Sequence, residues 1–279
     1  MIFIRNMIIN KLTSNVKIPY KLSKGSHKQR QIKSDILTDN LFKHINGIIK
    51  DNNSAFSYME LQRLIQEILP YKNLNIIVKN MEKESSDYDA ICEVLYNANK
   101  EIKAICIKLG GGGNYVESKF IPTFMHEFQH VADDIFHPKF LSRLQTLNKK
   151  NYANEKYDKF YDKYYYGSEF IEGKQDKKNV LKLIKHKTQK FLKGLNTEDK
   201  INYIQDIRYS LMSEIEAYKR QIKVAKELKS KGITINELDF EDYPKEGLFE
   251  DKINLLKSLA IEYISKERIK NASRIKKKK

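Results

Sequence analysis

Apolar residues return at every third or fourth position near the start of the chain, over residues 35–50 and again over residues 55–69. This spacing predicts two amphipathic helices. Ser54 is placed to cap the second helix, and Pro70 is placed to stop it. Residues 1–33 end in a basic, polar stretch with a proline and a glycine, so we expect them to form a flexible N-terminal extension.

The pattern then changes to short β-branched or apolar runs at residues 75–78, 91–96 and 102–109. The turn-like residues 97–100 separate the last two runs, which predicts a β-hairpin. In the run 102–109, Ile105, Ile107 and Leu109 share one face, whereas Ala104, Cys106 and Lys108 share the other. We therefore expect this strand to be partly covered and to lie at an edge of the sheet.

Long helical patterns follow the glycines at 110–113. The segment from Phe124 to Ile135 has no internal breaker, and Pro122 fits the first turn of a helix. Further helices are predicted at residues 139–165, 176–193, 198–230 and 247–272.

Together these elements predict an α+β fold that is mostly helical, with a small mixed β-sheet before the helix over 124–135. We expect three parts along the chain. The basic extension at 1–33 precedes one folded domain at 34–232, and a helical C-terminal portion with a basic tail occupies 233–279.

The net charge of the chain gives only weak information about its partners. The 279 residues carry a net charge of +16, which favours acidic partners such as nucleic acid or anionic lipid. However, only 8 of the 52 basic residues are arginine, the residue on which base reading depends most, and no nucleic-acid-binding motif occurs. We therefore expect no specific nucleic-acid partner.

Cys92 and Cys106 both lie in the apolar runs, which is typical of small core residues in a reducing compartment. Residues 1–9 are apolar but are interrupted by Arg5 and Asn6 and lack a small-residue cleavage site. They predict neither a signal peptide nor a membrane span. We expect a cytoplasmic protein, or one exported by a route that needs no signal.

The strongest chemical signal is the sequence His126-Glu127-Phe128-Gln129-His130, an HExxH motif. On a helix the two histidines are one turn apart, so both imidazoles can meet on one metal ion. Glu127 then lies beside the metal, where it can accept a proton from a water that attacks a carbonyl. The predicted order of elements also fits a zinc peptidase, because an edge strand before the motif can pair with an extended substrate.

With this motif, residues 74–222 resemble the zincins, the superfamily of HExxH zinc metallopeptidases. The resemblance implies that residues 34–232 form a zincin-like catalytic domain, with Zn²⁺ as the cofactor and a peptide or protein as the substrate. The metzincin branch needs Gly at 133 and His at 136, where this chain has Asp133 and Phe136. His137 lies too far along the helix to take the place of that histidine.

The gluzincin branch instead takes its third metal ligand from a glutamate on a later helix, and the segment SEIEAY at 213–218 resembles that helix. Two glutamates compete for the role. At 100° per residue, Glu214 lies about 60° from the centre of the apolar stripe of this helix and Glu216 about 140°. Glu214 is therefore the expected ligand. The stripe consists of Ile204, Ile207, Leu211, Ile215, Tyr218 and Ile222.

The nine residues HEFQHVADD are also similar to the active-site helix of the anthrax lethal-factor type of gluzincin. In that family a tyrosine that aids catalysis precedes the ligand glutamate, which points to Tyr166 with Glu169 or Glu172. The glycines at 167 and 173 argue against a ligand-bearing helix in this segment, and Glu169 is kept as a reserve.

Three more residues near these motifs have two readings each. Asp133 and Asp134 either orient a ligand histidine or are solvated helix acids. Tyr218, one turn after Glu214, either donates to the oxyanion formed in amide hydrolysis or packs in the core.

The sequence therefore predicts a zinc metallopeptidase in which His126, His130 and Glu214 bind Zn²⁺ and Glu127 is the general base. Two other functions stay open. One is a non-catalytic zincin-like module that binds a partner, and the other is a basic nucleic-acid-binding protein with a chance HExxH.

Overall fold

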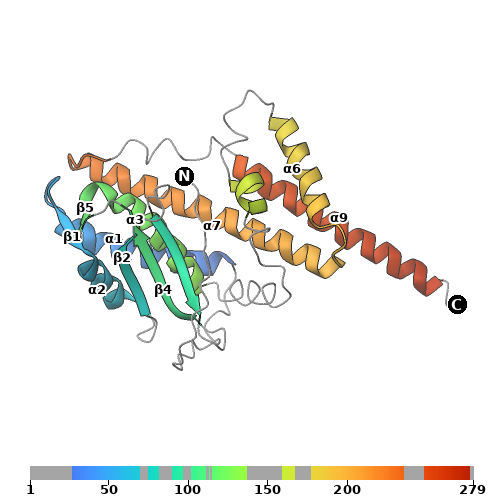
Figure 1. Cartoon of the computed structure of the whole chain (residues 1–279), viewed down its shortest axis with the longest axis horizontal. Helices are drawn as coiled ribbons and strands as arrows, with labels where there is room; N and C mark the ends of the chain where they lie inside the picture. Colours follow the sequence, from blue (N-terminus) through green and yellow to red (C-terminus); the bar gives the residue numbers. More distant parts are fainter. Residues whose placement is uncertain are drawn as a thin grey trace. The chain divides into compact units, whose positions relative to one another are not determined.

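The computed structural model describes residues 27–69, 75–81, 90–96, 102–110, 113, 115–136, 159–166, 177–235 and 248–276 (Figure 1). Several predicted features lie outside these residues. They are the N-terminal extension up to residue 26, the hairpin turn at 97–100, the helical pattern from 139 to 158 and the end of the basic tail.

Contacts within the chain divide it into two compact units. The first unit comprises Met1–Leu141 and Ser213–Tyr243, and the second comprises Ser142–Met212 and Pro244–Lys279. This division differs from the expected boundaries at 33/34 and 232/233. Its physical cause in the second unit is helix packing, because helix α6 (Lys177–Phe191) contacts helix α9 (Leu248–Lys276).

The first unit contains a three-stranded mixed sheet, as the sequence predicted. Strand β4 (Ile102–Leu109) pairs in parallel with β2 (Asn75–Asn80) and antiparallel with β3 (Ala90–Tyr96). The pairing of β3 with β4 is the predicted antiparallel pair. The expectation that residues 102–109 form an edge strand is wrong, because the strand order is β2-β4-β3 and β4 is central (Figure 1).

The reason lies on the face of β4 that carries Lys108. Ala104 and Cys106 on that face are buried, so a single lysine gave a misleading impression of exposure. Cys92 on β3 and Cys106 on β4 are both free and buried, which confirms that they are core residues. Cys92 is opposite Ile107 in the register, so the two cysteines point to opposite faces of the sheet.

A second, two-stranded sheet corrects the start of the second predicted helix. Strand β1 (Ala55–Ser57) pairs antiparallel with β5 (Tyr115–Glu117), and helix α2 (Tyr58–Ile68) begins only after β1. Its N-cap is Ser57 rather than Ser54, and Ser57 forms a capping box with Glu60. The Ser54 hydroxyl instead accepts hydrogen bonds from the backbone N–H groups of Lys50 and Asp51.

Helix α1 (His27–Ile48) begins inside the segment that was expected to be an extension, so residues 27–33 are helical. Helix α3 (Ile121–Phe136) follows a 3₁₀ turn at Ser118–Phe120 and has Pro122 in its first turn, as predicted. α3 contacts α1, β3 and β4, and residues 121–135 are all buried. The helix that carries HExxH is therefore a core element of the first unit (Figure 1).

The second unit is helical among its described residues. It contains a π-helix at Asp162–Tyr166, helices α6 and α9, and the N-terminal part of α7 (Thr197–Ser230). Gly194 and Gly232 follow α6 and α7 with φ of 91° and 82°, a conformation that favours glycine after a helix. Among the described helices none combines the length and apolarity needed to span a membrane.

The predicted fold class is confirmed: the described chain is α+β and mostly helical, with a small mixed β component.

Candidate metal centre

The two histidines of the motif lie on one face of α3. They are four residues apart on a helix with 3.6 residues per turn, and their ring centroids are 5.0 Å apart. Both side chains are buried. Because the whole helix is enclosed, the positions of these rings are set by packing on every side.

Glu214 on α7 completes the group. Its Oε2 lies 3.5 Å from His126 Nε2, and its Oε1 lies 3.5 Å from His130 Nε2. One potential ligand atom from each of the three residues lies within 4.8 Å of the others. The structure thus brings together the three residues that the sequence predicted as metal ligands.

The electrostatics of Glu214 favour the carboxylate form. Its side chain is only 12% exposed, and burial alone raises the pKa of a carboxyl group. The adjacent His130 and His126 outweigh this effect and hold the pKa of Glu214 well below its usual range. The pair of histidines therefore has an anionic partner.

The predicted catalytic residues lie next to this group. Glu127 follows His126 on α3 and is 1% exposed. The Tyr218 ring packs edge-on against the His126 ring, with centroids 4.7 Å apart and an interplanar angle of 79°. Tyr218 is buried, so its predicted packing role is confirmed, while a role in catalysis stays a prediction.

Of the competing ligands the structure describes only Glu216, which is not part of this group. Glu216 is 32% exposed and forms an ion pair with Lys219 at 3.0 Å. Glu169, Glu172, His137 and the side chain of Tyr166 lie outside the described residues.

Behind His130 lies a buried polar network that the sequence predicted only in part. His130 Nδ1 is 2.9 Å from Ser213 Oγ, which donates to Asp133 Oδ2 at 3.2 Å. Ser34 Oγ and Gln129 Nε2 donate to Asp133 Oδ1 at 2.5 and 3.0 Å. Asp133 is therefore connected to His130 through a serine.

The reading of Asp133 and Asp134 as solvated acids is wrong, because both are buried. Burial raises the pKa of Asp133 to about 6, although the hydrogen bond from Ser34, the nearby His130 and the hydrogen bond from Gln129 oppose this shift. Sequence reasoning missed Ser34 and Ser213. Ser213 precedes the ligand glutamate, but a single serine in a helix carries no distinctive signal.

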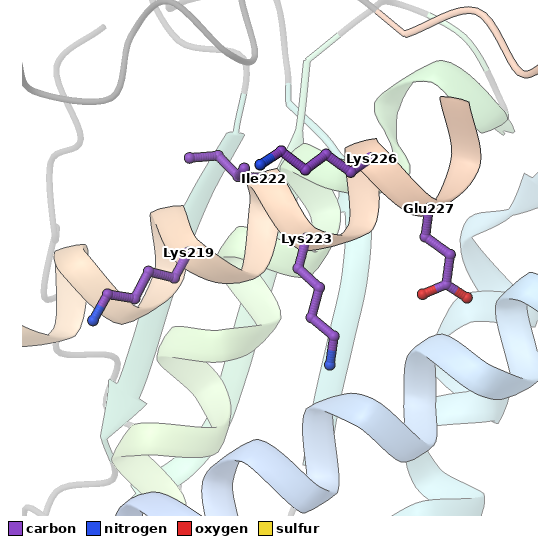
Figure 2. A pocket seen from close by; sticks show the side chains of 5 residues that line it. All are labelled: Lys219, Ile222, Lys223, Lys226 and Glu227. Carbon is purple, nitrogen blue, oxygen red and sulfur yellow. The ribbon is translucent and has the colours of Figure 1, made fainter. Parts of the chain in front are cut away.

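A hollow beside α7 is lined by none of the candidate site residues. Figure 2 shows its lining, with Lys223 and Glu227 pointing toward α1. There Lys223 donates to Asp39 at 2.7 Å and Glu227 accepts from Asn46 at 2.7 Å. The lining residues are Lys219, Ile222, Lys223, Lys226 and Glu227.

Comparisons with protein-family models, curated proteins and solved structures found no match. The function is therefore inferred from the chemistry of the residues themselves.

Proposed function

We propose that the protein is a zinc-dependent metallopeptidase of the gluzincin type. One observation carries this proposal: His126, His130 and Glu214, which are up to 88 positions apart in the sequence, converge with their ligand atoms within 4.8 Å. A chance HExxH on a core helix gives no reason for a buried carboxylate to lie 3.5 Å from both imidazoles.

The donor set fits zinc. Imidazole nitrogen and carboxylate oxygen are common zinc ligands, and two histidines with one glutamate form a ligand set of catalytic zinc sites. Structural zinc sites usually have four protein ligands. In the described part of the chain the candidate group has three members, which favours a centre with an open position for water or substrate.

The roles of the residues follow from this arrangement. His126, His130 and Glu214 would hold Zn²⁺, which supplies Lewis-acid activation of a water and of the substrate carbonyl. Glu127, beside His126, accepts the proton of the attacking water and passes it to the nitrogen of the leaving amine. Tyr218, packed against His126, is the candidate donor to the oxyanion.

The two other functions make different demands on the chain. A non-catalytic module would use the same ligands without needing Glu127 as a base. A nucleic-acid-binding protein would rely on its basic surface, yet Lys219 and Lys223 on α7 already pair with Glu216 and Asp39. Neither alternative explains both the ligand group and the neighbouring glutamate.

The test combines metal analysis with an activity assay. We expect close to one zinc per chain after purification in metal-replete buffer, and cleavage of an unfolded protein that stops with a chelator and returns with Zn²⁺. Bound zinc without cleavage would favour the non-catalytic module. Absence of bound metal, with binding to nucleic acid that falls steeply with salt, would favour the third function.

A further inference from the structure

Three helices of the first unit meet at the buried network behind His130. Ser34 lies on α1, Gln129 and Asp133 lie on α3, and Ser213 and Arg220 lie on α7. Ser34 is 99 positions from Asp133 in the sequence, and Ser213 is 80 positions from it. These five side chains are all buried, so they form hydrogen bonds with other groups of the protein rather than with bulk water.

The direction of the hydrogen bonds can be followed from Arg220. A guanidinium has donors only, and Arg220 Nε lies 3.4 Å from Gln129 Oε1. The amide of Gln129 therefore turns its Nε2 toward Ser34 Oγ, at 2.9 Å, and toward Asp133 Oδ1, at 3.0 Å. Ser34 accepts from Gln129 and gives its one proton to Asp133.

The same reasoning applies on the other side of the carboxylate. Asp133 accepts, so the one proton of the Ser213 hydroxyl is used in the bond to Asp133 Oδ2. Ser213 Oγ can then only accept from His130 Nδ1, 2.9 Å away. A neutral imidazole with its proton on Nδ1 has a lone pair on Nε2, and His130 Nε2 is the atom that faces Glu214.

We propose that Ser213 is a positioning residue. Its hydroxyl connects the Asp133 carboxylate to His130 Nδ1 and thereby holds this imidazole in the orientation in which Nε2 can bind the metal. The proposal rests on the metal site of the proposed function. It assigns a role to the residue directly before Glu214, so adjacent positions of α7 supply one ligand and the support of another. Ser34 on α1 holds the other oxygen of Asp133 and thereby fixes the orientation of the carboxylate.

The test compares metal binding by the full chain and three variants. Ser213→Ala removes the hydroxyl, and Ser213→Thr keeps it. Ser210→Ala is the matched control, because Ser210 is also on α7 but its hydroxyl donates only to the backbone carbonyl of Asp206. Affinity for Zn²⁺ is measured by competition with a coloured chelator, and the visible spectrum of the Co²⁺ form reports the ligand geometry.

We expect Ser213→Ala to weaken Zn²⁺ binding by roughly 10- to 100-fold and to change the Co²⁺ spectrum, as is typical when the hydrogen-bond partner of a ligand histidine is lost. Ser213→Thr and Ser210→Ala should stay close to the parent. Unchanged affinity in Ser213→Ala would overturn the proposal while leaving the metal site intact. A parent that binds no metal would overturn both. If Ser213→Ala does not fold, Zn²⁺ affinity is compared between Ser213→Thr and Ser213→Val, which have the same shape and differ only in the hydroxyl. Weaker binding by Ser213→Val supports the proposal, and equal binding by the two variants overturns it.

Discussion

Glu214 and Glu216 lie two residues apart on α7, yet their carboxylates have different surroundings. The Glu214 carboxylate is 3.5 Å from both histidines of α3 and is 12% exposed. The Glu216 carboxylate is 32% exposed and pairs with Lys219. Because successive positions of a helix are 100° apart, two residues turn a side chain to nearly the opposite face. The pair therefore offers a ligand and its matched control on one helix.

The first prediction uses this pair. Glu214→Ala should lose Zn²⁺ affinity by more than about 100-fold, because it removes an anionic ligand rather than a residue that only supports one. Glu216→Ala should bind Zn²⁺ like the parent. Titration of both purified variants with Zn²⁺ measures the contrast. Parent-like affinity in Glu214→Ala would mean that another acid completes the site.

The second prediction separates chemistry from metal binding. Glu127→Gln keeps the size and shape of a side chain that is 1% exposed but removes its ability to accept a proton. We expect zinc content and the melting temperature to stay near those of the parent, while kcat falls by a factor of about 10² or more. Glu117→Gln, which changes an exposed acid on β5, should keep full activity. A Glu127→Gln enzyme as fast as the parent would exclude Glu127 as the base.

Much of the site could be predicted because its signals are local. The spacing of His126 and His130 requires only a helix, and the choice of Glu214 over Glu216 follows from the apolar stripe of α7. Five of the six stripe positions are buried, and the last, Ile222, is partly exposed and lines the hollow on α7 (Figure 2). Helix periodicity thus gave the face of α7 that meets α3.

The rest depends on pairings between distant segments, which periodicity does not encode. The position of β4 in the sheet is set by its parallel partner β2, and the start of α2 is set by the pairing of β1 with β5. Ser34 is the first residue of the predicted folded domain, and its partner Asp133 is 99 positions away on another helix. A single hydrogen-bonding serine leaves no pattern along the chain.

The third prediction concerns the corrected start of α2. In the capping box, Ser57 Oγ accepts from the Glu60 N–H at 3.2 Å, and Glu60 Oε2 accepts from the Ser57 N–H at 2.7 Å. Ser57→Ala should therefore lower the free energy of unfolding by about 1 kcal/mol. Ser258→Ala on α9 removes an exposed hydroxyl that bonds only its own helix, so it should change stability by less than about 0.5 kcal/mol. Urea unfolding of both variants compares the two positions, and equal stabilities would contradict a capping role for Ser57.

The last prediction concerns Lys252 in the second unit. Its side chain is 1% exposed, and its Nζ donates to the Tyr165 backbone carbonyl at 2.6 Å and lies 5.5 Å from the centre of the Phe249 ring. Burial lowers the pKa of Lys252 to about 8, because the ammonium is removed from water without an anionic partner in the described part of the chain. The ordinary pKa of 10.5 applies when the chain is unfolded.

Between pH 8 and 10.5 the unfolded chain therefore binds more protons at this position than the folded chain. The free energy of unfolding consequently rises with pH in this range. Below pH 8 the cost of burying the charge is fully present. From pH 8 to 9.5 the free energy of unfolding of the parent should increase by about 2 kcal/mol more than that of Lys252→Met, which has no charge to titrate. Urea unfolding at several pH values, in chelator so that metal binding does not contribute, measures the difference. Lys257→Met, which changes an exposed lysine on the same helix, should show the same pH dependence of stability as the parent. If the stabilities of the parent and Lys252→Met changed with pH in parallel, Lys252 would not be buried as a charge.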